Sequence, residues 1–148
     1  MGIYLNPENV DFQKSLNSEI YIDKTELIAY TNKKLNTEQG YICVSRPRRF
    51  GKSMAANMLT AYYSRGCDSG ELFQGLKIAT HPDFEKHLNQ YNVIHLNMQN
   101  FLSKTQTIEQ MIALVTKAVG RDLLRAYPDV DYLDKTILTF MLDDIYQD

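Results

Sequence analysis

YICVSRPRRFGKS, residues 41–53, joins an apolar run, a basic loop and a Gly-Lys-Ser that opens a helical pattern. This order is typical of a phosphate-binding loop (P-loop), in which a strand leads into a loop whose backbone N–H groups surround a phosphate chain. The helix that follows begins near Ser53, so the positive end of its dipole also faces the phosphates. We predict that Lys52 reaches the β- and γ-phosphates as the catalytic lysine, and that the Ser53 hydroxyl binds Mg²⁺.

One position departs from the general P-loop pattern, which has glycine where this chain has Arg46. The substitution removes the freedom of glycine to turn tightly. It leaves intact the N–H groups at the end of the loop, which are the ones expected to hold phosphate, whereas Pro47 has no N–H to offer. The predicted nucleotide-binding residues are therefore Arg49, Phe50, Gly51, Lys52, Ser53 and Met54.

Length and composition describe an ordinary globular chain. The 148 residues are 44% hydrophobic and 23% charged, enough for one domain with a real core. The net charge of −2 excludes a global attraction to nucleic acid or to a membrane surface. Against that background, four cations within residues 46–52 indicate a local anion site.

Neither the cysteines nor the ends of the chain suggest an extracellular protein. Cys43 and Cys67 lack the spacing of metal ligands or of a disulfide framework. No secretory signal is visible near Met1, and no apolar stretch approaches the 18 or so residues needed to cross a bilayer. We therefore expect a cytoplasmic protein that does not contact a membrane.

Hydrophobic spacing predicts helices separated by two strands. The segments 23–26 and 107–110 have the form of capping boxes at helix starts, with Asp23 as the first cap. Runs rich in apolar residues predict the two strands. The expected helices cover 10–16, 23–36, 53–65, 82–88, 107–127 and 133–145, and the expected strands 41–45 and 92–98.

This order predicts an α/β P-loop NTPase fold, a three-layer α/β/α architecture with a parallel sheet. Two strands are too few for such a sheet, because parallel strands are buried on both faces and need neighbours on both edges. We therefore expect the sheet to be incomplete and residues 1–148 to form the N-terminal part of a single domain. Residues 1–40 would be a lead-in segment with a helix, and residues 41–148 the P-loop core portion.

The loop RPRRFGKS at 46–53 resembles that of the AAA-ATPase-like domain of bacterial and archaeal proteins. Three further segments share the resemblance, namely YIDKT at 21–25, FQGL at 73–76 and VIHLN at 93–97. In that family arginine is the usual residue at position 46. The resemblance implies ATP and Mg²⁺ as cofactors. It also implies a PD-(D/E)XK nuclease-like domain as a C-terminal partner in the full-length protein, with nucleic acid contacted through that domain.

A P-loop ATPase also needs an acidic residue that holds magnesium and prepares the attacking water. The resemblance implies that this residue ends an apolar strand soon after the last helix. The in-chain alternative is Asp143 or Asp144, but the apolar residues around them recur with helical spacing. We therefore expect the second motif beyond Asp148, and weak or absent hydrolysis by this chain.

Four other residues are candidates for contact with the nucleotide or the metal. Asp23 is a helix cap or a ligand, and the cap is favoured. Tyr21 and Ile22 could lie against adenine, an idea that depends on analogy between related ATPases. Asn97 could contact the nucleotide at the end of its strand or make a structural hydrogen bond.

Two functions follow from the basic loop. The first is an ATP-binding P-loop domain of an ATPase. The alternative is a non-catalytic nucleic-acid-binding module that uses the Arg-Pro-Arg-Arg loop, and the acidic net charge and the lack of aromatic residues among these arginines count against it. Arg48 and Arg49 could clamp phosphate, act on a neighbouring subunit or keep the loop soluble.

Overall fold

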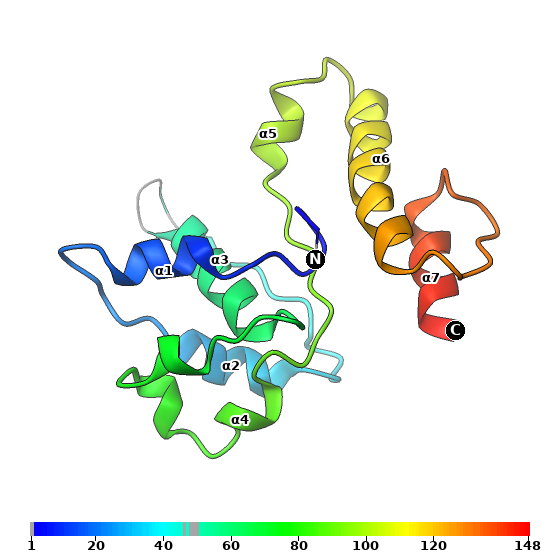
Figure 1. The fold of residues 1–148 in the computed structure, drawn as a ribbon. Coiled ribbons are helices and arrows are strands. Elements are labelled where there is room, and N and C mark those ends of the chain that lie inside the picture. Colours follow the sequence, from blue (N-terminus) through cyan, green and yellow to red (C-terminus); the bar gives the residue numbers. More distant parts are fainter. Residues whose placement is uncertain (1, 46, 48–50) are drawn as a thin grey trace. The chain divides into compact units, whose positions relative to one another are not determined.

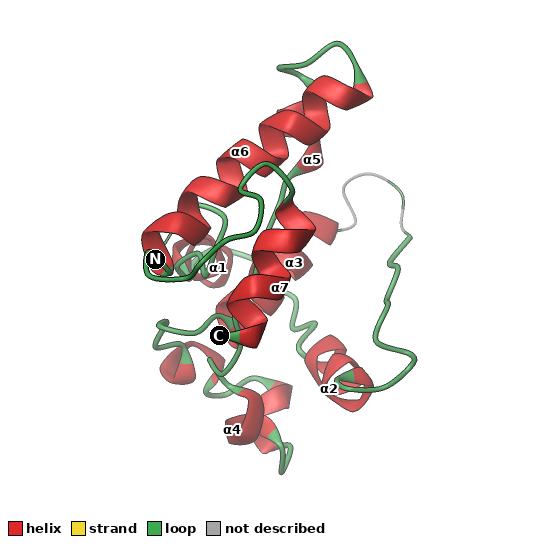
Figure 2. Ribbon diagram, turned by 90° about the vertical axis from the view of Figure 1, so that its right-hand side faces the viewer, coloured by secondary structure: helices red, strands yellow, loops and turns green. Residues whose placement is uncertain are grey.

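The computed structural model describes residues 2–45, 47 and 51–148. Within these residues the chain is built from helices and loops, with no sheet (Figure 2). Two isolated bridges, Leu5 with Ile94 and Ser64 with Tyr91, are the only β-pairings in that part of the chain. The chain divides into two compact units, here called the central unit (Glu8–Val93) and the terminal unit (Met1–Pro7 with Ile94–Asp148).

The predicted three-layer α/β/α fold with a parallel sheet is wrong for the described residues. The expected strand at 41–45 is a segment without regular structure, in which Tyr41 is 99% and Val44 51% exposed. A parallel strand needs hydrogen-bonded neighbours and cover on both faces. Nothing in the described part of the chain pairs with residues 41–45, so their apolar side chains remain in contact with water.

The second expected strand, at 92–98, is also absent. Only Ile94 pairs there, through its single antiparallel bridge to Leu5. Helix α5 (Met98–Leu102) begins where the strand should end, and the Asn97 side chain accepts a hydrogen bond of 3.2 Å from the Gln99 N–H. Asn97 is therefore a helix cap, and the structural hydrogen bond that is one of its two interpretations is present.

The helices of the central unit largely match the predicted ones. The structure adds two short 3₁₀ helices where the sequence indicates a loop. In chain order the elements are α1 (Val10–Leu16), α2 (Glu26–Lys34), α3 (Lys52–Tyr63), the 3₁₀ helices Gly70–Phe73 and Lys77–Thr80, and α4 (Phe84–His87).

Aromatic side chains fill the core of the central unit. Phe12 stacks on Phe73 with ring centroids 4.9 Å apart, and Tyr62 meets Phe73 edge-on at 5.5 Å. Each fully buried side chain of this size contributes about 1.5–3 kcal/mol of transfer free energy. The Tyr62 hydroxyl, buried with its ring, donates a hydrogen bond of 2.6 Å to the Phe84 carbonyl. These contacts hold α1 beside α3 (Figure 1).

Polar contacts join α2 to the same helix. The Tyr63 hydroxyl donates a 2.6 Å hydrogen bond to the Asn32 side-chain oxygen and lies 2.6 Å from the Thr31 hydroxyl. Burial raises the pKa of Tyr63 to about 12, so the phenol stays protonated and can donate throughout the physiological range. The pair of helices is therefore fixed by directional bonds as well as by packing.

Asn89 completes the C-terminal end of α3. Its side-chain amide donates hydrogen bonds of 2.9 Å to the carbonyls of Ala61 and Ser64, and its side-chain oxygen accepts one of 3.1 Å from the Ser69 N–H. The last carbonyls of a helix have no partners within the helix, so these bonds satisfy groups that would otherwise be unpaired. Asn89 has φ +55°, a left-handed conformation that asparagine tolerates better than most residues.

The terminal unit pairs two longer helices, α6 (Ile108–Ala126) and α7 (Leu138–Gln147), with the short α5 against α6 (Figure 1). Thr107 caps α6 as the capping box predicts, accepting a hydrogen bond of 3.1 Å from the Gln110 N–H. The buried side chains at its centre are Leu5, Val119, Leu123 and Met141.

A buried carboxylate fixes the N-terminal residues to α6. Asp122 is only 3% exposed and accepts hydrogen bonds from the backbone N–H groups of Tyr4 (2.7 Å) and Leu5 (3.2 Å). A Cβ atom at Gly2 would lie 2.4 Å from the Asp122 carboxyl carbon, so the close approach requires glycine.

Among the described residues, no helix combines the length and the apolarity that crossing a bilayer requires.

We predict that Asn89→Ala lowers the free energy of unfolding by about 3 kcal/mol. It removes the bonds to α3 and places a Cβ-bearing residue without a local hydrogen bond in the left-handed region. Asn89→Gly should cost about 1 kcal/mol less, because only the hydrogen bonds are lost. Urea denaturation measures both.

Asn36 supplies the matched control, since it is exposed and has φ +57°. Asn36→Ala should cost only the backbone part, about 1 kcal/mol, and Asn36→Gly should be near neutral. An equal loss of unfolding free energy for Asn36→Ala and Asn89→Ala would show that the hydrogen bonds of the Asn89 side chain to α3 do not stabilise the protein.

Candidate functional site

The first turn of α3 carries the Gly-Lys-Ser of the basic loop. Gly51 is the N-cap and has φ +81°, a left-handed conformation that favours glycine. Lys52 and Ser53 are the first two residues of the helix, and both are exposed. The helical hydrogen bonds begin with the Ala55 N–H, which donates to the Gly51 carbonyl at 2.9 Å. The N–H groups ahead of it have no partner within the helix.

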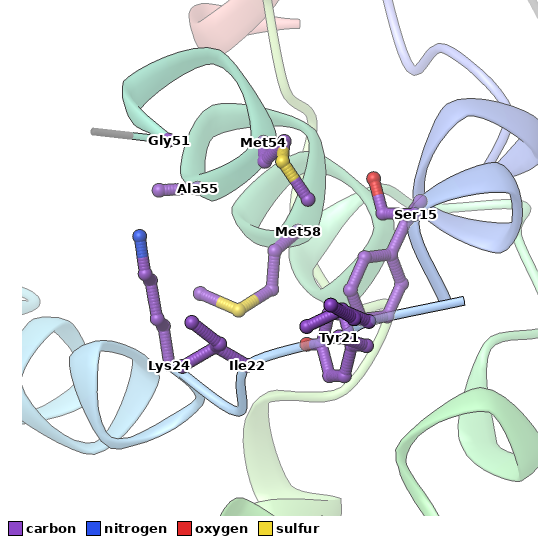
Figure 3. A pocket seen from close by; sticks show the side chains of 10 residues that line it. Ser15, Tyr21, Ile22, Lys24, Gly51, Met54, Ala55 and Met58 are labelled. Atoms are coloured by element: carbon purple, nitrogen blue, oxygen red, sulfur yellow. The ribbon is translucent and has the colours of Figure 1, made fainter. Parts of the chain in front are cut away.

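A second lysine approaches this helix end from the turn before α2. A Cβ atom at Gly51 would lie 2.6 Å from the Lys24 Nζ, so the ammonium group lies directly beside the glycine. Figure 3 shows the Lys24 side chain directed toward Gly51 and Ala55. The positive end of the α3 dipole and a side-chain cation therefore coincide at one place.

Asp23 and Thr25 fix the turn that carries Lys24. The Asp23 carboxylate accepts hydrogen bonds from the Thr25 N–H (2.9 Å), the Thr25 hydroxyl (2.6 Å) and the Lys77 N–H (2.8 Å). The buried Thr25 hydroxyl in turn accepts one from the Ile78 N–H at 3.1 Å. Partial burial raises the pKa of Asp23, but the bonds from Thr25 and Lys77 outweigh it and hold the pKa below its ordinary value. The carboxylate is thus a structural acceptor ahead of α2. The prediction that Asp23 is the N-cap of this helix is wrong, because the N-cap is Thr25.

An apolar pocket of about 350 Å³ opens next to this helix end. Aliphatic, aromatic and thioether side chains form most of its wall, and Tyr21 meets Phe12 edge-on with ring centroids 6.3 Å apart. Burial, and secondarily the charge of Asp23, raise the pKa of Tyr21, which therefore stays neutral. The lining residues are Phe12, Ser15, Ile20, Tyr21, Ile22, Lys24, Gly51, Met54, Ala55 and Met58 (Figure 3).

The pocket has two chemically different parts. Methionine and aromatic side chains give a flat, polarizable surface suited to an apolar or planar group. Lys24 and Gly51 form the side next to the α3 N-terminus, where the Lys24 charge and the positive end of the helix dipole favour an anion. Its volume lies in the range of small-molecule sites. The arrangement suits a ligand with a flat apolar body and an anionic tail.

A family model described as "Predicted AAA-ATPase" matches residues 10–147, almost the whole chain. The chain belongs to the AAA-ATPase-like family. Comparison with curated proteins gives no match, and comparison with solved structures gives none. Membership of the AAA-ATPase-like family indicates the use of a nucleotide and a metal in general terms.

The structure describes only part of the predicted site of this AAA-ATPase-like chain. Gly51 and Met54 line the pocket, whereas Lys52 and Ser53 lie on the first turn of α3 and are not among the lining residues. The predicted contacts of Arg49 and Phe50, like the open roles of Arg46 and Arg48, lie outside the described residues.

Sequence reasoning missed Lys24 and most of the apolar wall. Lys24 stands in the YIDKT segment that carries the resemblance, so its position was marked, but nothing in the spacing shows that it approaches Gly51. Phe12 and Met58 have the helical spacing of core residues, and both belong to the hydrophobic core of the central unit as well as to the pocket wall. Tyr21 and Ile22 are the two wall residues that analogy did single out.

The two acids considered for magnesium lie on a helix. Residues 138–147 form α7, so the predicted helical state is confirmed for them, whereas residues 133–137 of the expected helix lie in the loop before α7. Asp144 accepts a hydrogen bond of 2.9 Å from the Leu133 N–H, and Asp143 is exposed. Asp144 is therefore engaged in fixing the loop before α7.

We predict that Asp23→Ala lowers stability by about 1 kcal/mol at pH 7, since three hydrogen bonds to a partly exposed carboxylate are lost. The pKa of Asp23 is lowered by folding, so its contribution is fully present above the pKa of the unfolded chain, about 3.9. It disappears as the pH falls through the lower pKa of the folded state. The difference between variant and wild type should therefore shrink below about pH 4 in urea titrations.

Asp11→Ala serves as the control, because Asp11 is exposed and its contact with Lys14 spans 3.8 Å at the surface. Its effect should stay within about 0.5 kcal/mol at every pH. A pH-independent loss for Asp23→Ala would show that its carboxylate charge contributes nothing.

Proposed function

We propose that this chain is the ATP-binding domain of an ATPase that works with Mg²⁺. The observation that carries the proposal is the apolar pocket that adjoins the N-terminus of α3 beside Lys24 and Gly51. The AAA-ATPase-like family, with its general use of nucleotide and metal, supports the same function.

In this proposal the adenine base occupies the apolar pocket. Tyr21 and Met58 offer an aromatic ring and a thioether to the faces of a planar base. Ser15 is buried, with 8% of its surface exposed, and its hydroxyl donates a hydrogen bond of 3.2 Å to the Asp11 carbonyl rather than pointing a free donor at the base. The base would therefore be held mainly by packing and by exclusion of water.

The phosphates would lie at the first turn of α3. The positive end of the helix dipole favours negative charge there, and Lys24 and Lys52 supply cations from two different elements. The exposed hydroxyl of Ser53 would be the ligand for Mg²⁺. When bound, Mg²⁺ neutralises charge on the β- and γ-phosphate oxygens. The task of this chain is to orient the triphosphate against that ion.

We assign ATP hydrolysis to the full-length protein, where a nuclease-like domain would be the partner and would provide contact with nucleic acid. Hydrolysis needs a carboxylate that prepares the attacking water. Asp144, bonded to the Leu133 N–H in the terminal unit, is a poor choice for that task. Binding is therefore the property to test in this chain.

We predict that Lys52→Ala weakens binding of MgATP by at least about tenfold, because one charge-assisted hydrogen bond to phosphate is worth about 1.5–3 kcal/mol. Isothermal titration calorimetry with and without Mg²⁺ measures the loss. Ser53→Ala should reduce the gain in ATP affinity that addition of Mg²⁺ produces.

Lys33→Ala is the matched control, since Lys33 is an exposed lysine at the other end of the neighbouring helix α2. It should bind MgATP as the wild type does. If wild type, Lys52→Ala and Lys33→Ala all bind equally, the proposed phosphate site is wrong.

A second prediction separates the base from the phosphates. Ala55 lies on the pocket wall, and Ala55→Phe should fill the space assigned to adenine. ATP should bind the wild type more tightly than tripolyphosphate does, and the variant should bind the two ligands alike. Tripolyphosphate affinity should not change, which makes it the internal control for folding. Tight ATP binding by Ala55→Phe would place the base elsewhere.

A further inference from the structure

A groove of about 700 Å³ runs along α6 in the terminal unit. Apolar and small residues of α6 line it together with positive side chains. Three of these come from α6, and the fourth comes from the loop between α6 and α7 (Figure 1). The cations are Lys117, Arg121, Arg125 and Lys135, and all four are exposed.

Charge is strongly segregated within this unit. Its lysines and arginines are Lys104 and the four that line the groove. Its acidic residues outnumber them, yet none lines the groove. They are Glu109, Asp122, Asp129, Asp131, Asp134, Asp143, Asp144 and Asp148. A unit with more acids than bases has therefore collected nearly all its positive charge on one surface.

The cations of α6 form a regular row. Lys117, Arg121 and Arg125 are four residues apart, so they share one helix face with a rise of about 6 Å from each to the next. Within the described part of the chain, none of the four groove cations takes part in an ion pair. The row is thus available to an anionic ligand.

The nearest acids in sequence are occupied by other groups. Asp122, next to Arg121, accepts from the N–H groups of Tyr4 and Leu5. Asp134, next to Lys135, accepts from the Thr136 N–H and hydroxyl, bonds that hold the pKa of its carboxyl below the ordinary value. The Lys135 ammonium lies 5.9 Å from the centre of the Tyr132 ring. These contacts keep the carboxylates from neutralising the groove.

We propose that this groove binds the phosphate backbone of a nucleic acid. A polymer with one charge on every link matches an evenly spaced row of cations better than a single anion does. The guanidinium groups of Arg121 and Arg125 suit the geometry of phosphate oxygens, to which arginine can donate two parallel hydrogen bonds. Leu114 and Leu124 give the groove apolar surface for the sugar edges. The site is separate from the nucleotide pocket and does not depend on the function proposed for it.

Binding of a fluorescein-labelled 20-base-pair DNA to the full 148-residue chain, followed by anisotropy, tests the proposal. Four phosphate contacts predict a log–log salt slope of about −3.6, which is a loss of roughly 150-fold between 50 and 200 mM salt. Arg121→Ala with Arg125→Ala removes two contacts. The slope should fall to about −1.8 and the loss over the same range to roughly 12-fold.

Lys104→Ala with Lys33→Ala is the control that also removes two exposed lysines but leaves the groove intact. It should keep the wild-type slope, and circular dichroism should show all variants folded.

Three outcomes would overturn the proposal. They are an equal loss in the control, loss of binding only with Arg48→Ala and Arg49→Ala in the basic loop, and equally tight binding of polyglutamate, which would indicate a general anion site.

Discussion

The anchoring of α3 at one end is the constraint on which the central unit depends. Its C-terminal half is buried through Met58 and Tyr62, and its last carbonyls are bonded by Asn89. Its first turn, with Lys52, stays exposed. A helix held in this way presents its positive dipole end, and N–H groups that have no partner within the helix, at a fixed place, which is the physical requirement of a phosphate site.

The rest of the candidate site is built by fixing a second turn against that helix end. Asp23 and Thr25 bind backbone N–H groups of the 3₁₀ helix Lys77–Thr80, and the turn between them carries Lys24 to Gly51. The aromatic core then forms the base of the pocket, since Phe12 belongs to both. The proposed nucleotide site therefore depends both on the aromatic core and on the hydrogen bonds of Asp23 and Thr25.

The terminal unit uses its charges differently. Its buried carboxylate, Asp122, holds the backbone at residues 4 and 5, so this negative charge of α6 is directed into the unit. The positive side chains of the same helix line an open groove. Opposite charges on neighbouring residues are kept apart because successive helical residues point about 100° from each other. The net charge of the whole chain does not show this separation of positive and negative side chains.

Local information in the sequence determined most of the helices, though not α5, because spacing and capping act within a few residues. It also determined the cap at Thr107, the helical state of residues 138–147 and the Gly-Lys-Ser at the start of α3. It also carried the family resemblance. It was wrong about the sheet, because an apolar run shows that a segment can form a strand but not that neighbours will pair with it. Only the tertiary structure brought Lys24 to Gly51 and gathered the basic groove, since each depends on where separate turns and faces meet in space.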